Sequence, residues 1–180
     1  MNNPIKSIGV DLSLTGTGLV CLEDGKLIEQ KLIKSKPSGD RPIDELKRIL
    51  TIAISVQNFI DIYKPDIVVI ENLAFGIQKT TSLTQLAGLN YFIRSGLYKI
   101  GIKFVLVAPT TLKKYVTGNG AAKKDVLMVE VYKRLGVTML DDNLCDAYSL
   151  AQIGLSLLGG NSKDTNKIQK EVISLITKQL

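Results

Sequence analysis

Three carboxylates stand next to apolar sequence at positions where they could do chemistry. Asp11 follows residues 8–10 at the end of a predicted strand, and Glu71 follows residues 67–70 in the same way. Either residue alone could be a turn residue or a helix cap. Asp146 lies on the second turn of a predicted helix, beside apolar residues, where burying a lone carboxylate is costly. Brought together, these side chains would need protons, a basic partner or a bound cation to offset their repulsion.

The start of that predicted helix supplies a fourth carboxylate. Asp141 has the residue type and position of an N-cap, and we expect it to be one. Asp142 lies four residues before Asp146 and therefore shares a helical face with it. An N-terminal cap is the alternative role for Asp142, so the candidate acidic set has three or four members.

Carboxylates without histidine describe an oxygen-only site for a hard cation. The chain contains no His and no Trp, which excludes Ser-His-Asp and Cys-His nucleophilic systems and zinc held by imidazole. We expect Mg²⁺, for which Mn²⁺ can substitute. Two ions per site would activate a water and stabilise the leaving oxygen in phosphodiester hydrolysis.

The positive charge is concentrated in the second half of the chain. The net charge is +6; residues 1–90 carry 10 basic and 10 acidic side chains, whereas residues 91–180 carry 13 and 7. Such a surplus favours a polyanion such as nucleic acid, although a solvated lysine-rich surface is the alternative explanation. An acidic metal centre within a basic protein is the combination that a nuclease needs.

Length and composition are typical of one domain in a reducing compartment. The chain has 180 residues, 45% of them apolar, and its two cysteines form no Cys-x-x-Cys pair. The amino-terminal residues lack the long uncharged core of a signal peptide, and no run reaches the roughly 18 apolar residues of a membrane span. We therefore expect a cytoplasmic protein with no membrane contact.

The hydrophobic pattern predicts the elements that must position the acids. Strands are expected at residues 5–11, 18–22, 27–33, 66–71 and 103–107. Helices are expected at residues 42–63, 83–100, 110–115, 122–135 and 141–158, with a final amphipathic helix near residues 168–176. We assign residues 1–158 to a nuclease domain, and residues 159–180 to a short linker and a C-terminal helix of the same domain.

This order predicts an α/β fold of the ribonuclease H-like type. Three antiparallel strands followed by two parallel strands with helical crossovers make a mixed five-stranded sheet with helices on both faces. Right-handed crossovers would place the first and fourth strands side by side. Asp11 and Glu71 would then emerge at the same edge of the sheet.

The ordered motifs resemble the RuvC family of Holliday junction resolvases, over about residues 5–158. The resemblance rests on the segments at residues 8–11 with 15–18, 70–72, 116–124 and 146–147. It implies a homodimer that binds four-way DNA junctions and makes paired symmetric nicks with Mg²⁺, in the cytoplasm of a bacterial or phage-infected cell. A phage-type member is one alternative within the family.

The resemblance also implies the metal ligands. By position in the motifs, Asp11, Glu71 and Asp146 match metal ligands of the family. The family commonly has an acid three residues before its last Asp, where this chain has Asn143. We take Asp142 as the substitute because of its shared helical face, with Asn143 as the rival.

Basic and aromatic residues are implied as DNA contacts. Lys113 matches one family lysine near the scissile phosphate, and Lys123 or Lys124 matches a second; an ordinary solvated face is the alternative. Phe75 matches an aromatic that wedges open the junction centre, but it lies one residue farther from Glu71 than usual, and a core Phe is the alternative. We expect Lys113 and Lys123 to act in catalysis. The full set of expected DNA contacts is Phe75, Lys79, Lys113, Lys114, Lys123 and Lys124.

Three other functions compete with a junction resolvase. The first is a broader endonuclease that debranches forks and flaps. The second is an actin-like ATPase fragment, since residues 11–16 also resemble that superfamily's first phosphate loop, although such enzymes need two halves and this chain supplies one. The third is a junction-binding protein that does not cut, against which the complete acidic set argues.

Overall fold

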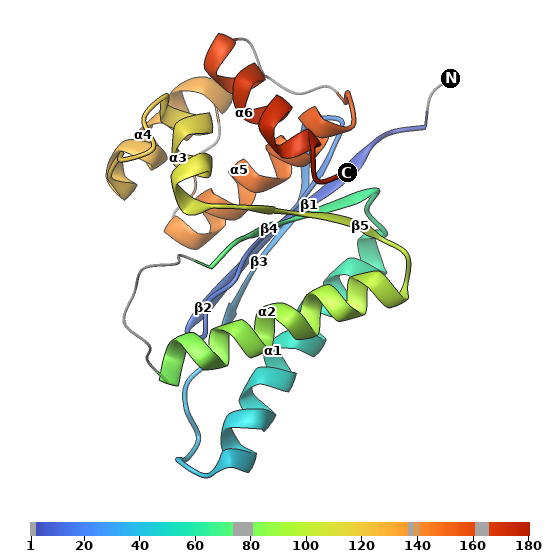
Figure 1. Cartoon of the computed structure of the whole chain (residues 1–180), viewed down its shortest axis with the longest axis vertical. Helices are drawn as coiled ribbons and strands as arrows, with labels where there is room; N and C mark the ends of the chain where they lie inside the picture. The colour runs from blue at the N-terminus through green and yellow to red at the C-terminus, as the bar shows by residue number, and fades with distance from the viewer. Residues whose placement is uncertain (1–2, 74–80, 137–138, 140, 161–165) are drawn as a thin grey trace.

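A mixed five-stranded sheet organises the molecule (Figure 1). The computed structural model describes residues 3–73, 81–136, 139, 141–160 and 166–180. The strand order is β3-β2-β1-β4-β5. The strands are β1 (Lys6–Asp11), β2 (Gly16–Glu23), β3 (Lys26–Lys34), β4 (Ile67–Glu71) and β5 (Lys103–Val107).

The sheet combines an antiparallel meander with a parallel pair, as predicted. β1 pairs with β2, and β2 with β3, in antiparallel register, whereas β4 is parallel to both β1 and β5. The β2–β3 connection is a two-residue turn in which Asp24 and Gly25 have φ values of 46° and 82°. Two positive φ angles match the right-handed twist of the flanking strands, which explains why Asp-Gly serves here.

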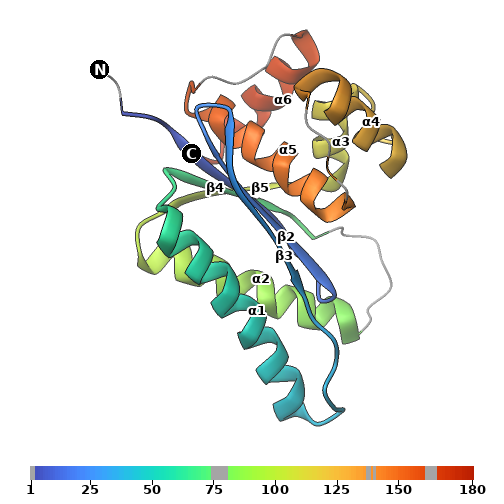
Figure 2. The ribbon, with the colours of Figure 1, turned by 180° about the vertical axis from the view of Figure 1, so that it is seen from behind.

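Helices cover both faces of the sheet, which confirms the predicted architecture (Figures 1 and 2). One face carries α1 and α2, and the other carries α3 to α6. The helices are α1 (Pro42–Tyr63), α2 (Thr81–Lys99), α3 (Pro109–Thr117), α4 (Lys124–Leu135), α5 (Asp142–Leu157) and α6 (Lys167–Thr177). Each face has its own apolar core, because side chains of β1 and β4 alternate between the two sides. The described part of the chain has no helix long and apolar enough to cross a membrane.

Observed and expected boundaries differ at a few places. β2 begins at Gly16 and not at residue 18, because Gly16 already pairs with Lys34 of β3. α4 begins at Lys124, so Lys123, expected inside the helix, is its extended N-cap residue. α6 packs on the same core as α5 through Val172 and Ile176. The predicted boundary at residue 158 stays a prediction.

Glycines let α5 cross the sheet at close range. A β-carbon built on Gly9 of β1 would overlap the Ala147 carbonyl oxygen and lie 2.6 Å from the Ala151 amide nitrogen. A β-carbon on Gly18 of β2 would overlap the Asn143 carbonyl oxygen. The backbone of α5 therefore rests directly on β1 and β2, and this contact fixes the height of α5 above Asp11.

Candidate active site

Two carboxylates meet at the carboxyl ends of neighbouring parallel strands. Val10 of β1 is in register with Ile70 of β4, so Asp11 and Glu71 follow at the same edge of the sheet. Asp11 is only 6% exposed. Burial, the negative charge of Glu71 and a hydrogen bond between the two side chains raise the pKa of Asp11 to about 8. Burial also raises the pKa of Glu71, although its hydrogen bond with Asp11 opposes that change.

The third carboxylate comes from the helix that rests on the sheet. Asp146 lies on the second turn of α5, next to Ala147, whose carbonyl group touches Gly9. Burial and the charge of Asp11 raise the pKa of Asp146 to about 7. Three carboxyl groups from β1, β4 and α5 therefore lie within electrostatic reach of one another.

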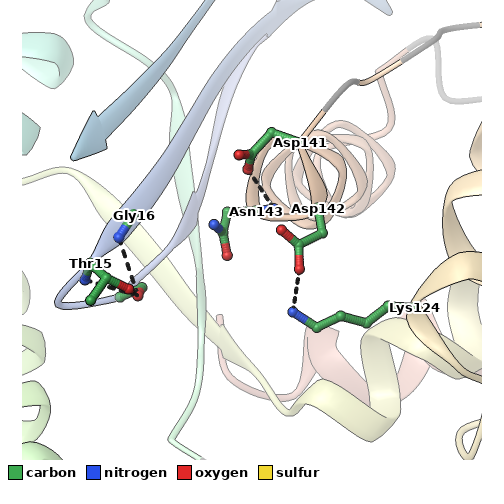
Figure 3. Close-up of polar contacts among 7 residues, drawn as sticks. Thr15, Gly16, Lys124, Asp141, Asp142 and Asn143 are labelled. Atoms are coloured by element: carbon green, nitrogen blue, oxygen red, sulfur yellow. Dashed lines mark hydrogen bonds and ion pairs between the residues drawn. The ribbon is translucent and has the colours of Figure 1, made fainter.

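The fourth carboxylate, Asp142, is paired with a lysine. Its Oδ2 lies 2.5 Å from Nζ of Lys124, across 18 residues of sequence (Figure 3). This ion pair holds the pKa of Asp142 below its usual range. Asp141 is the N-cap of α5, as predicted, because its side chain accepts a hydrogen bond from the Asn143 amide at 2.9 Å.

Asn143 faces the turn between β1 and β2. A β-carbon on Gly16 would come within 3.1 Å of Asn143 Nδ2, and Figure 3 shows the amide between Gly16 and Asp142. Asp142 is close enough for its charge to raise the pKa values of Asp11 and Asp146, whereas Asn143, on the same turn of α5, lies against Gly16. Either side chain could supply the remaining oxygen ligand.

The turn itself is closed by its own hydroxyl groups. Ser13 Oγ accepts hydrogen bonds from the backbone amides of Thr15 and Gly16 at 3.2 and 3.4 Å. Thr17 Oγ1 donates to the Ser13 carbonyl oxygen at 2.7 Å. Because these amides already have acceptors, the turn offers fewer donors to a nucleotide phosphate than the resemblance to an actin-like loop suggests.

The predicted lysines differ in burial and in their electrostatic contacts with the acids. Lys113 of α3 is half-buried, and its charge lowers the pKa values of Glu71 and Asp146. Lys114 and Lys123 are exposed, and Lys124 is engaged by Asp142. Sequence reasoning missed this ion pair, since nothing in the spacing of the two residues signals it. Phe75 and Lys79 lie outside the described residues.

The donor set fits a hard cation, but the carboxylates are not closed around one point. Among the described residues, no three His, Cys, Asp or Glu side chains are grouped tightly enough to hold an ion. Two local contacts account for this, because Asp11 hydrogen-bonds Glu71 and Asp142 is turned to Lys124. Burial is the main cause of the raised pKa values of Asp11 and Asp146, and Lys124 offsets it only in part, so a divalent cation would favour the charged forms of these acids.

Comparison with known proteins identifies relatives over most of the chain. The family described as "Crossover junction endodeoxyribonuclease RuvC" matches residues 7–175. The RuvC protein of Paenarthrobacter aurescens is 28% identical over 89% of this chain and 90% of its own length. That of Mycobacterium leprae is 29% identical over 67% of this chain, and the chain spans 64% of that relative's length.

The fold is also that of solved relatives. Thermus thermophilus RuvC has a TM-score of 0.69 at 18% identity, over 87% of this chain and 98% of that one. A second structure of that protein, also at a TM-score of 0.69, is a complex with a Holliday junction substrate. Members of the family are generally metal-dependent nucleases. The match over residues 7–175 confirms the family inferred from the motifs: the chain belongs to the RuvC family of crossover junction endodeoxyribonucleases.

Proposed function

We propose that this protein resolves four-way DNA junctions by paired symmetric nicks. The observation that carries the proposal is the meeting of Asp11, Glu71 and Asp146 at one edge of a ribonuclease H-like sheet. The junction complex of Thermus thermophilus RuvC supports the choice of substrate. A debranching nuclease that also cuts forks and flaps is the alternative, and DNA as substrate supports a cytoplasmic location.

Asp11, Glu71 and Asp146 would hold two Mg²⁺ ions, with Asp142 or Asn143 as the fourth ligand and Mn²⁺ as an acceptable substitute. Bound there, the metal would supply Lewis-acid activation of the attacking water and of the leaving oxygen. Glu71 is placed to bridge the two sides of the site, because it contacts Asp11 and lies within reach of the Asp146 charge.

Lysines around the cluster would bind the DNA backbone. Lys113 is half-buried and its charge lowers the pKa values of Glu71 and Asp146, which supports a role for it in stabilising charge on the scissile phosphate. Lys123 is exposed and stays the second proposed catalytic lysine. Lys114 is exposed and would anchor a neighbouring phosphate, and Lys124 stays a proposed DNA contact. Phe75 and Lys79 stay proposed DNA contacts.

Paired nicks require two active sites, and we propose a homodimer. On α2, the side chains of Tyr91, Phe92 and Tyr98 are all exposed. Tyr91 and Tyr98 are two helical turns apart and therefore on the same side of α2, and exposed aromatic residues are typical of protein contact surfaces. A light-scattering mass of the purified protein in solution tests this point, and a monomer mass at micromolar concentration would contradict it.

The test of the function uses labelled four-way, forked and linear DNA, with and without Mg²⁺. The matched variant is Glu71→Gln, which keeps the side-chain shape and removes the charge. We expect symmetric nicks only in the four-way junction, lost without metal and in the variant. Cutting of every branched form would establish the debranching alternative, and binding without cutting would refute the nuclease assignment.

A further inference from the structure

Among the described residues, Lys124 is the one basic residue that forms an ion pair with a candidate metal ligand. Its ammonium lies 2.5 Å from Asp142 Oδ2, and its charge also lowers the pKa values of Asp11, Glu71 and Asp146. The charge of this one ammonium group therefore acts on all four candidate carboxylate ligands. Lys124 thus offsets part of the negative charge that a divalent cation would neutralise.

The pair and the metal site compete for the same carboxylate. While Asp142 Oδ2 holds the ammonium, that oxygen cannot be a metal ligand without sharing it between two cations that repel each other. A single ammonium likewise cannot bind Asp142 and a DNA phosphate with full strength at the same time. Occupying one partner therefore weakens the contact to the other.

The Lys124–Asp142 ion pair is exposed to solvent and can break without a change in the fold. Lys124 is the first residue of α4, its side chain is 64% exposed, and the Asp142 side chain is 40% exposed. In the described part of the chain, this ion pair is the one recorded for Lys124. A rotation of the lysine side chain is enough to break it, without movement of α4 or α5. An exposed pair of this kind is also weak enough to be exchanged.

We propose that Lys124 is a displaceable counter-ion, which holds Asp142 when the site lacks metal and is released toward the DNA backbone when Asp142 binds a divalent cation. The inference rests on the proposed function, because it assumes that the acidic cluster is the metal site. It assigns Lys124 a positioning role in which metal binding and phosphate binding are coupled. It also favours Asp142 over Asn143 as the fourth ligand.

The test measures Mn²⁺ binding by calorimetry, without DNA and at constant pH. The test variant is Lys124→Gln. The control is Lys133→Gln, since Lys133 lies on the same helix, is equally exposed at 64% and pairs with Glu130 away from the cluster. We expect Lys124→Gln to bind Mn²⁺ about 3- to 10-fold more tightly than the wild type, and the control to match the wild type.

Repeating the substitution in the Asp142→Asn protein separates loss of the ion pair from the general effect of removing a positive charge near the acids. In the Asp142→Asn protein, adding Lys124→Gln should raise the Mn²⁺ affinity by a smaller factor than in the wild-type background, because the pair is already broken and only the longer-range charge effect on the other acids remains. An equal gain in both backgrounds would overturn the exchange, as would unchanged or weaker binding in Lys124→Gln alone. Absence of Mn²⁺ binding in the folded wild type would also overturn it.

The result of the Mn²⁺-binding test does not depend on whether the protein cuts DNA. A protein that binds Mn²⁺ with the expected pattern and cuts no branched DNA would refute the proposed function and leave the counter-ion in place. A protein that resolves junctions but shows no effect of Lys124→Gln on Mn²⁺ affinity would do the reverse. The two proposals therefore fail separately.

Discussion

Adding one methyl group at Gly9 should damage both stability and catalysis, because Gly9 sets the distance between β1 and α5. The new β-carbon would overlap the Ala147 carbonyl oxygen and lie 2.6 Å from the Ala151 nitrogen, where ordinary contact begins at 3.4 Å. To relieve the second contact alone, α5 must rise by about 0.8 Å, the difference between these two distances. Both neighbours are backbone atoms, so no side-chain rotation can absorb the change.

Two effects follow from that displacement. Overpacking of this kind costs roughly 1–3 kcal/mol of unfolding free energy. Asp146 precedes Ala147 on α5, so it would move away from Asp11 by a similar distance. A misplacement of about 1 Å in a catalytic group can lower the rate by roughly 100-fold. We therefore expect the Gly9→Ala protein to be less stable, and to cut junctions far more slowly even where it is fully folded.

The assay pairs urea unfolding with junction cleavage at saturating Mg²⁺, well below the unfolding temperature of the variant. The control is Gly88→Ala in α2, where an added β-carbon meets nothing within 4 Å. Replacing a helical Gly with Ala should raise the unfolding free energy by about 0.5–1 kcal/mol, the opposite direction to the change expected for Gly9→Ala. A Gly9→Ala protein with wild-type stability and cleavage would refute the claim that this contact positions Asp146.

Three further predictions concern the site. In the nicking assay, Asp142→Asn should lower the cleavage rate at least about 100-fold, whereas Asn143→Ala should lower it less than about 3-fold. The reverse result would assign the fourth metal ligand to Asn143. Lys113→Ala should slow single-turnover cleavage by roughly 10- to 100-fold and should weaken junction binding, measured by titration, less than about 3-fold. Equal losses of cleavage rate and binding would make Lys113 a phosphate anchor only. Because the pKa of Asp11 is raised to about 8, its contribution to metal-free stability is fully present below about pH 4 and is lost progressively as the pH rises to about 8. Asp11→Asn should therefore raise the unfolding free energy by roughly 1–3 kcal/mol at pH 9 and much less at pH 5, and equal gains at both pH values would contradict this linkage.

The arrangement of the strands could be predicted because each has a strong local signal. Residues 67–70 form an uninterrupted apolar run between Pro65 and Glu71, which is typical of a short strand buried on both faces. The Asp-Gly turn at residues 24–25 fixes the β2–β3 pairing, and Pro42 and Pro65 bracket the first helix and the linker after it. Placing β1 beside β4 then followed from crossover handedness. That single step brought Asp11 and Glu71 together.

The first turn of α5 could not be predicted to the same detail. Whether Asp142 or Asn143 points to the metal site depends on how α4 packs against α5, and the contact that orients Asp142 comes from Lys124, 18 residues earlier. The sequence offers Lys123 and Lys124 as equivalent candidates. They become different only because α4 begins at Lys124 and leaves Lys123 as an extended N-cap residue.

The site therefore has one half with fixed geometry and one half that can adjust. Asp11 and Asp146 are held relative to each other by backbone contacts between Gly9 and α5, so their spacing is a property of the fold. Asp142 and Lys124 are exposed and joined only by an ion pair, so their arrangement depends on which ions are present. Substitutions in the first half should change stability and rate together, whereas substitutions in the second should change metal affinity with little effect on folding. Comparing Gly9→Ala with Lys124→Gln in the same unfolding and Mn²⁺-binding assays tests that division, and a large loss of stability in Lys124→Gln would disprove it.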